Sequence, residues 1–285
     1  MFRLFTVTTL AMLGFVANSI LNRLALTSGE AGAIDYTGIR LASGAVALVL
    51  IHRARTGRGA LSRHGGSWAG AAALSGYALC FSIAYVQLGA GTGALILFAS
   101  VQAGMLFWAI RSGERPGLLE WGGFALAFAS FVMLSAPGLT APAPVALGLM
   151  MLAGFSWAAY SLIGRASTDP LADTTGNFLR CLPFAAALVL IGWADNPPSL
   201  TGLVYAVVSG AIASGLCYTL WFAALPQMSR TTAAFVQLTV PVIAATGGVL
   251  LIAEPVTLRL VVASIGILGG VALAVGCGAM RRGRQ

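Results

Sequence analysis

Long apolar stretches, each close to the length of a membrane-spanning helix, follow one another along almost the whole chain. A helix that crosses the hydrocarbon core of a bilayer needs about 20 mostly apolar residues. We interpret ten stretches as such helices, because short segments with Pro, Gly or charged residues separate them. The predicted spans are 4–26, 35–51, 68–88, 92–111, 118–134, 145–163, 176–193, 200–223, 231–253 and 256–277. The pattern predicts an all-α integral membrane protein with no room for a soluble domain.

Charged residues form only 8% of the chain, whereas about a quarter of the residues of a soluble domain are charged. With 58% hydrophobic residues, this composition excludes a disordered chain, a disulfide scaffold and an ordinary cytosolic enzyme. All 16 basic residues are Arg, and with 8 acidic residues they give a formal net charge of +8. In a membrane protein, such an excess marks the cytoplasmic loops.

The Arg residues are distributed unequally between the two sides of the predicted membrane. If the N-terminus lies in the cytoplasm, twelve of the 16 fall in cytoplasmic segments, and Arg23, Arg40, Arg180 and Arg259 lie within spans or at their ends. The sequence thus predicts that both termini are cytoplasmic. Topology and contact with anionic lipid explain the basic segment 52–67 better than nucleic acid does, because it has no aromatic ring to stack on a base.

The sequence also matches itself at an offset of 140 residues. Shared apolar residues would be weak evidence, but charged residues pair at the same offset and at matching places in their spans. The matched positions are Arg40 with Arg180, Glu114 with Glu254, and residues 47–51 with 187–191. We therefore predict two five-helix repeats, residues 1–140 and 141–285, whose topologies are inverted because five is odd. Inverted repeats are typical of secondary transporters, whose substrate site lies between the halves.

Several motifs are similar to those of a known family. They are Gly-Glu-Arg-Pro at 113–116, Ala-Glu-Pro at 253–255, and Pro241 in the ninth predicted span. Together with the five-plus-five organisation, they make the chain resemble the drug/metabolite transporter superfamily and, within it, the EamA-type exporters such as the bacterial aromatic amino-acid exporters. The first half departs from the pattern, with Val101 where the proline would fall. The resemblance implies export of amino acids or similar small metabolites across the bacterial inner membrane. It also implies that the fifth and tenth helices support the bundle or an oligomer contact.

Two charged pairs follow from the inverted symmetry. Arg40 and Glu254 would meet on one face of the membrane, and Arg180 and Glu114 on the other. We hypothesise that each pair ties one repeat to the other as part of a gate. The alternative is that each charge caps a nearby helix end or extends to the membrane surface.

The interior of the predicted bundle is poor in ionisable residues. No Asp, Glu, His or Lys lies at the middle of a predicted span, and Arg40 and Arg180 lie near span ends. Proton relays, exporters of lipophilic cations and carriers of phosphate esters generally need buried ionisable groups. We therefore expect a neutral or zwitterionic substrate.

Polar and aromatic side chains inside the spans are the candidate substrate contacts. They are Asn18, Tyr77, Phe81, Tyr85, Phe98, Gln102, Trp157, Tyr160, Tyr218, Trp221, Gln237 and Pro241. The aromatic rings could form an apolar wall with hydroxyl donors, or could instead pack against lipid. Pro241 cannot donate to the carbonyl of Gln237, so this carbonyl could receive a substrate ammonium or could be satisfied by a neighbouring Ser or Thr. The small residues Gly210 and Ser214 predict a close approach between helices.

Other functional classes lack their characteristic residues. Both His residues fall in the basic segment, so a Ser protease would lack its base, and the four Cys lie singly on separate spans, which argues against a zinc site. The sequence has no phosphate-binding loop or dinucleotide motif, and no charged ring or filter typical of a channel. We expect a transporter of a small molecule, embedded in lipid, with no metal, cofactor or nucleic acid. An intramembrane enzyme, a channel or an exporter of another metabolite class are the alternatives.

Overall fold

The computed structural model describes residues 2–56, 65–88, 90–136, 143–195, 197–244, 246 and 257–282. Every regular element within these ranges is a helix. In the same ranges, eight helical stretches are long and apolar enough to cross a membrane, and Leu118–Leu134 is a shorter apolar helix. The predicted all-α membrane protein is confirmed.

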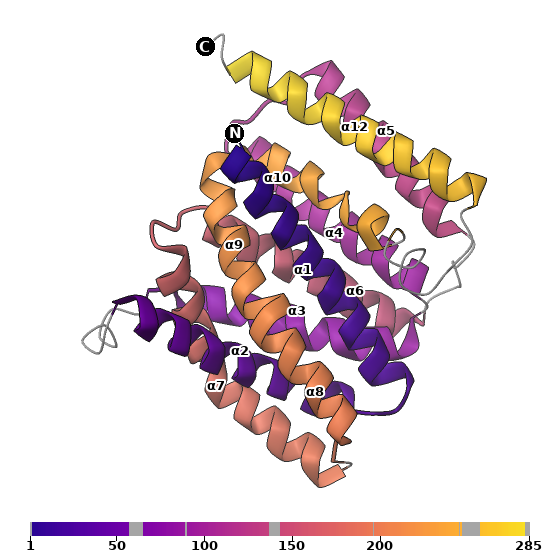
Figure 1. Cartoon of the computed structure of the whole chain (residues 1–285). Helices are drawn as coiled ribbons and strands as arrows, with labels where there is room; N and C mark the ends of the chain where they lie inside the picture. The colour runs from indigo at the N-terminus through magenta and orange to yellow at the C-terminus, as the bar shows by residue number, and fades with distance from the viewer. Residues whose placement is uncertain are drawn as a thin grey trace.

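The helices follow the predicted spans closely (Figure 1). In the first half they are α1 (Phe2–Thr27), α2 (Ala33–Thr56), α3 (Trp68–Gln87), α4 (Ala90–Arg111) and α5 (Leu118–Ser135). In the second half they are α6 (Pro144–Gly164), α7 (Pro170–Asp195), α8 (Leu200–Val208), the π-helix η3 (Ser209–Leu216), α9 (Cys217–Ala224), the 3₁₀ turn η4 (Leu225–Gln227), α10 (Arg230–Gln237) and α12 (Leu258–Arg282). The stretch from α8 to η4 is the eighth predicted span, which the sequence pattern had presented as one regular helix.

Local sequence signals set several helix ends. Ser67, Ser199 and Ser229 each precede a helix and accept a hydrogen bond from the backbone N–H three residues further on, which satisfies a donor that the helix itself leaves free. α10 ends at Gln237, and a turn at residues 238–239 separates it from the helical residues 240–244, which include Pro241. The proline therefore coincides with the interruption of the ninth predicted span.

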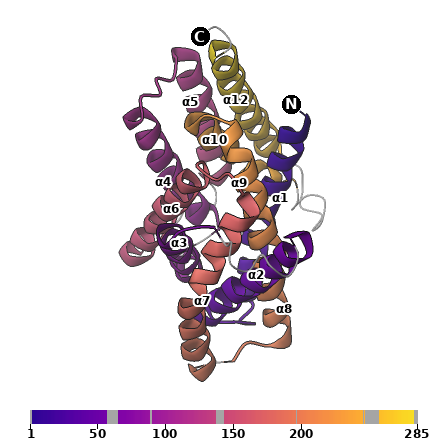
Figure 2. The same cartoon turned by 90° about the vertical axis from the view of Figure 1, so that its left-hand side faces the viewer.

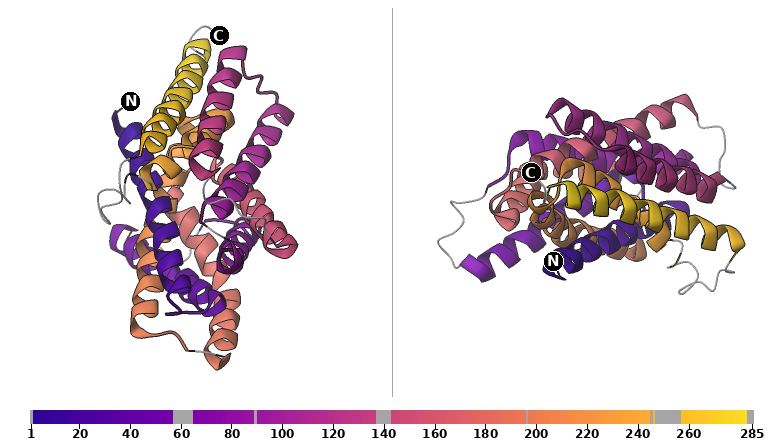
Figure 3. Two further views of the ribbon diagram at one scale, coloured as in Figure 1. Left: turned by 90° about the vertical axis from the view of Figure 1, so that its right-hand side faces the viewer. Right: turned by 90° about the horizontal axis from the view of Figure 1, so that it is seen from above.

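Helices at corresponding positions of the two halves pack against each other. α2 lies against α7, and α5 lies against α12. In addition, α3 packs along α6, and α1 packs along η3 and α9. Figures 1 and 2 show α5 and α12 side by side at one margin of the bundle. This contact is close because a Cβ atom on Gly123 would lie only 2.5 Å from the carbonyl oxygen of Gly270. Figure 3 shows that α1 begins at the end of the molecule where α12 finishes.

Candidate substrate site

Buried polar side chains from both halves of the chain meet between α1, α2, α3, α6 and the η3–α9 stretch. We call this group the central cluster, and its members are Asn18, Arg40, Tyr77, Trp157, Ser209, Ser214 and Tyr218. No member is more than 7% exposed. Polar groups at membrane depth need hydrogen-bond partners within the protein or a ligand, so the contacts inside the cluster define what it can bind.

Arg40 is the charged centre of the cluster. Its Nη2 donates to the Tyr218 hydroxyl at 2.7 Å, and its Nε donates to the Ser214 hydroxyl at 3.0 Å. Its Cζ also lies 5.6 Å from the ring centroid of Tyr77, within cation–π range. The expectation that Arg40 carries its charge near the end of its span and not in the bundle interior is therefore wrong. The Cα of Arg40 lies near the start of α2, but the long side chain carries the charge inward to Tyr77 in the middle of α3 and to Tyr218 at the start of α9.

Asn18 connects the hydroxyl groups of the cluster. Its Oδ1 accepts a hydrogen bond from Ser209 at 2.6 Å, and its Nδ2 lies 3.4 Å from the Tyr218 hydroxyl and 3.5 Å from the Tyr77 hydroxyl. One turn further along α1, Asn22 donates to Ser82 on α3 at 2.9 Å. Both Asn therefore lie on the face of α1 that turns inward.

The π-helix η3 supplies the two Ser residues of the cluster. Its hydrogen bonds join residues five apart, so Ser209 and Ser214 lie about one turn from each other and both face inward. η3 also approaches α2 closely, because a Cβ atom on Gly210 would collide with the Arg40 carbonyl oxygen and with Ser43. The close approach predicted from Gly210 and Ser214 is confirmed.

Trp157 forms the aromatic floor of the cluster. Its ring centroid lies 4.8 Å from those of both Tyr77 and Tyr218, and 5.1 Å from that of Phe15. Its Nε1 donates to Gln237 Oε1 at 2.7 Å, which ties α6 to α10. The cluster is thus a guanidinium, one amide and two Ser hydroxyl groups enclosed by aromatic rings.

Three further predicted residues extend this aromatic wall. Phe81 lies 5.4 Å from Tyr77 and 4.5 Å from Tyr85, measured between ring centroids along one stripe of α3. Tyr160 lies 5.7 Å from Trp157 on α6. All three are buried, so the structure places these rings inside the bundle rather than against lipid.

The remaining predicted aromatic and amide contacts lie outside the cluster. Trp221 donates to Ser161 at 3.0 Å, and its ring centroid lies 5.7 Å from that of Phe15, which in turn contacts Trp157 and Tyr218 of the cluster. Phe98 packs on Phe131 of α5 at 5.9 Å, so the structure does not bring it to the cluster. Gln102 donates to a backbone carbonyl of α10 at 2.8 Å and joins helices instead.

The helix break before Pro241 has a local hydrogen-bond solution. Thr239 donates through its hydroxyl to the Val236 carbonyl at 2.8 Å, and the backbone N–H of Thr239 reaches the same oxygen at 3.0 Å. Thr239 thus satisfies the Val236 carbonyl and not that of Gln237, so neither alternative for the Gln237 carbonyl is tested. A substrate contact at the Gln237 carbonyl stays a prediction.

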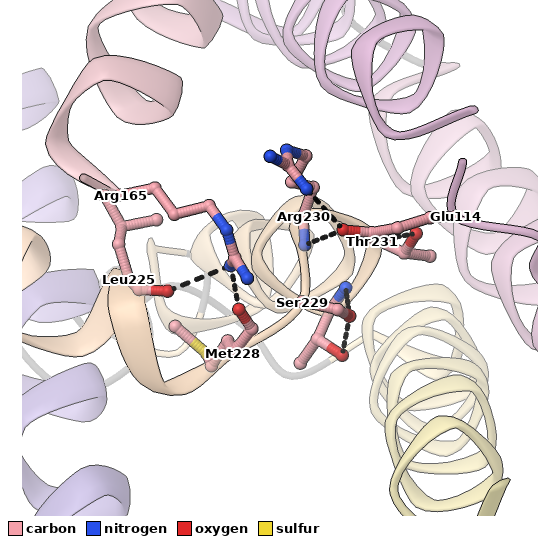
Figure 4. A network of polar contacts seen from close by, with 8 residues as sticks. Glu114, Arg165, Leu225, Met228, Ser229, Arg230 and Thr231 are labelled. Atoms are coloured by element: carbon pink, nitrogen blue, oxygen red, sulfur yellow. Dashed lines mark hydrogen bonds and ion pairs between the residues drawn. The ribbon is translucent and has the colours of Figure 1, made fainter. Parts of the chain in front are cut away.

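Glu114 binds the start of α10. It accepts hydrogen bonds from the backbone N–H groups of Arg230 and Thr231 at 3.1 Å each, and from the Thr231 hydroxyl at 2.9 Å (Figure 4). It also forms an ion pair with Arg230 Nη1 at 3.2 Å. Burial alone would raise the pKa of Glu114, but the hydrogen bonds from Thr231 and Arg230 outweigh it and hold the pKa below its ordinary value.

Arg165 at the end of α6 binds the segment just before α10. Its Nη1 donates to the Leu225 carbonyl at 3.1 Å and to the Met228 carbonyl (Figure 4). Together, Glu114 and Arg165 fasten the linker and first turn of α10 to α6 and to the turn between α4 and α5. We call these contacts the α10 clamp.

The predicted pair of Arg180 and Glu114 does not form. Arg180 Nη1 donates to the carbonyls of Gly65 and Gly176 at 2.8 Å each, and its Cζ lies 6.0 Å from the Trp68 ring, so it fastens the start of α3 to α7. The pairing fails because the turn that carries Glu114 packs against α10, not α7. Glu254, the predicted partner of Arg40, lies outside the described residues.

Comparisons with known proteins identify the family. The model of the EamA-like transporter family matches residues 145–276. Uncharacterized protein PA1977 of Pseudomonas aeruginosa is 48% identical over 272 residues, which cover 95% of this chain and 94% of that protein. A protein of known crystal structure, 20% identical, superposes with a TM-score of 0.74 over 94% of this chain and 97% of its own, and so shares the fold. The chain belongs to the EamA-like transporter family.

EamA-like proteins are membrane transporters, which is the functional class that the sequence motifs predicted. The matched segment runs from α6 into α12 and therefore falls within the second predicted repeat. The cluster, by contrast, draws Asn18, Arg40 and Tyr77 from outside that segment, and Trp157 and Tyr218 from within it.

Sequence reasoning missed Arg40 as a member of the central cluster in this EamA-like chain, and it missed Arg165 and Arg230 in the α10 clamp. A signal for Arg40 was present, since it lies in the apolar part of its helix, away from the charges at the helix ends, and is followed closely by the small residues 42–45. Small residues leave space for neighbouring helices and for a long side chain to turn inward. No comparable signal marked Arg165 or Arg230, which share their composition with ordinary cytoplasmic turns.

Proposed function

We propose that this EamA-like protein is a secondary transporter that exports amino acids, aromatic and other neutral ones, or similar small metabolites by alternating access. The observation that carries this proposal is the central cluster. Polar groups are costly inside a membrane bundle and mark functional sites there. Here they come from both halves of the chain and lie among aromatic rings that suit an apolar or aromatic substituent.

The packing of the bundle supports two inverted repeats, residues 1–140 and 141–285, as the moving units. A twofold relation between the halves would place equivalent helices against each other, and α2 on α7 and α5 on α12 are such pairs. A site formed between two repeats can open to either side when the repeats rock against each other. The central cluster has this position, since each half supplies several of its residues.

The α10 clamp supports a gate at the cytoplasmic end. We infer from the Arg distribution that both termini lie in the cytoplasm of a bacterial inner membrane. α10 begins near the end of the bundle where α1 begins and α12 finishes (Figure 1), and Glu114 binds its first turn (Figure 4). Release of Glu114 and Arg165 from the start of α10 would free this helix to move away from α4 and α6.

Counterflow in proteoliposomes tests the proposal. Purified protein would be reconstituted with an unlabelled amino acid inside, and entry of the same labelled amino acid would be followed for a panel of neutral and aromatic amino acids. We expect saturable entry that internal substrate accelerates. Entry without saturation or acceleration would indicate a channel, and no entry of any amino acid would refute the proposed substrate class.

A matched pair of Tyr variants connects transport to the cluster. Tyr218→Phe removes the hydroxyl that accepts from Arg40 and lies near Asn18, while Tyr205→Phe makes the same change on α8, outside the cluster. We expect the first to slow counterflow at least about tenfold, because a hydrogen bond to a charged group is worth about 1.5–3 kcal/mol. The second should leave counterflow unchanged. Equal effects of both changes would exclude the cluster as the site.

A further inference from the structure

The central cluster contains a positive charge that the described residues do not neutralise. The Arg40 side chain is 1% exposed, and its Nη1 has no hydrogen-bond partner among the residues that the structure describes. Its other nitrogen atoms donate to hydroxyl groups, which carry no charge. A buried charge without a counter-ion is strongly unfavourable unless a ligand completes it.

The described carboxylates do not supply this counter-ion. Over the described ranges, the ion pair that forms joins Glu114 to Arg230, at the α10 clamp. Asp173 accepts from Gly66 and Ser167, beside the start of α7. Asp35 lies on the same helix as Arg40 but forms no ion pair with it. The unused donor therefore lies among neutral and aromatic groups of the central cluster.

We propose that Arg40 binds the carboxylate of the transported substrate, so that the site requires a carboxylic acid with an apolar or aromatic substituent, with or without an α-amino group. This inference rests on the proposed transport function and names its substrate class. Guanidinium groups bind carboxylates through charge-assisted hydrogen bonds with defined geometry. One carboxylate oxygen would accept from Nη1, and the Tyr218 hydroxyl can donate to the other.

The rest of the cluster is suited to the remainder of such a molecule. The ring centroid of Trp157 lies 4.8 Å from that of Tyr77 and 4.8 Å from that of Tyr218. The three rings present an apolar surface next to the guanidinium. Asn18 offers an amide oxygen for a substrate donor, although that oxygen already accepts from Ser209. The cluster has a built cation for the carboxylate but no built anion for an ammonium group, so the carboxylate is the group that it selects.

Acid and amide pairs of ligands test the proposal on the full-length protein in detergent. The probes are L-phenylalanine, L-leucine, 3-phenylpropionate and 4-methylpentanoate, each compared with its amide, and binding is measured by calorimetry and by thermal stabilisation. We expect each acid that binds to do so at least about tenfold more tightly than its amide, since a charge-assisted hydrogen bond is lost with the carboxylate. Equal affinity of acid and amide, or no binding of any acid, overturns the proposal.

Variants of Arg40 separate substrate binding from a structural role. Arg40→Gln should abolish the preference for the acid, and Arg40→Lys should retain part of it because the charge remains without the planar fork. A variant that lowers stability but keeps the wild-type ratio of acid to amide affinity overturns the proposal. If Arg40→Gln does not fold, Arg40→Lys and the wild-type ligand series decide the question. Glu254→Gln should keep the preference for the acid. If this variant lost the preference, Glu254 would instead be a residue that shapes the site.

Transport and binding outcomes are distinguishable. If the acids bind with the expected dependence on Arg40 but no counterflow occurs, the carboxylate site stands and the proposed transport function fails. If labelled L-phenylalaninamide enters as fast as L-phenylalanine, transport stands and the carboxylate site fails.

Discussion

The contribution of Glu114 to the stability of the α10 clamp can be measured directly with two variants. Glu114→Gln keeps the size of the side chain and one carbonyl acceptor but removes the charge, whereas Arg230→Gln removes only the ion pair. The backbone N–H groups of Arg230 and Thr231 keep their acceptor in the second variant but not fully in the first. The comparison therefore separates helix capping from the ion pair.

The ion pair and the helix cap are expected to contribute different free energies to the stability of α10. The ion-paired side chains of Arg230 and Glu114 are 28% and 21% exposed, so water screens their attraction, and surface ion pairs typically contribute about 0.2–1 kcal/mol. Loss of a helix cap costs about 0.5–2 kcal/mol. We expect Glu114→Gln to destabilise the first turn of α10 by about 1–2 kcal/mol, which is about a 5- to 30-fold change in an opening equilibrium. Arg230→Gln should change it by about twofold.

Hydrogen–deuterium exchange of the backbone amides measures this opening in detergent or nanodiscs. The readout is the protection of residues 229–237 relative to α6. Glu120→Gln is the control, because Glu120 caps its own helix through Gly117 at the start of α5 and should alter exchange only there. If Arg230→Gln costs as much as Glu114→Gln, the ion pair and not the cap holds α10. If neither variant changes exchange at α10, the clamp contributes nothing.

Three further predictions follow from other contacts. Because hydrogen bonds hold the pKa of Glu114 below its ordinary value of 4.5, protection of α10 should be complete above that pH and should fall as pH drops through the lower folded pKa, with Glu114→Gln losing this dependence. Trp157→Phe leaves the buried Gln237 oxygen without its 2.7 Å donor and should lower stability by about 1–3 kcal/mol in thermal unfolding, while Gln237→Leu added to it should restore part of the loss. Gly210→Val places atoms against the backbone of α2 and should cost about 1–3 kcal/mol or more, whereas Gly276→Ala, which meets nothing within 4 Å, should be tolerated in a size-exclusion and thermal-stability comparison.

The positions of the helices could be predicted from the sequence because each depends on one local quantity, the length of an apolar stretch. The ninth predicted span was expected to be continuous, but α10 ends at Gln237, shortly before Pro241. The π-helix could not be predicted this way. Ser209 and Ser214 are five apart, a spacing that a regular helix would turn to different faces, and the hydrogen bonds that bring them together depend on α1 and α2.

Charged partners were harder to predict than helices, for a physical reason. A long side chain separates its charge from its Cα, so the position of Arg40 near the start of α2 concealed a guanidinium among residues of α3 and α9. The repeat offset relates Arg180 to Arg40 as sequence positions, but it does not determine which turn each side chain contacts. Glu114 shows the same limit, since its partner is a helix start rather than the Arg that symmetry suggested.

The contacts of η3 connect substrate binding with movement of the bundle. Ser214 and Tyr218 reach Arg40 only while η3 and α9 lie against α2, and the closeness of that packing depends on Gly210. If the two repeats rock apart, both hydrogen bonds to Arg40 break together and leave the guanidinium with more free donors. A bound carboxylate would stabilise that separated arrangement by replacing the lost acceptors, whereas an amide could not do so as well. The proposed charge of the substrate would thus decide both which molecules bind and how readily the occupied transporter changes conformation.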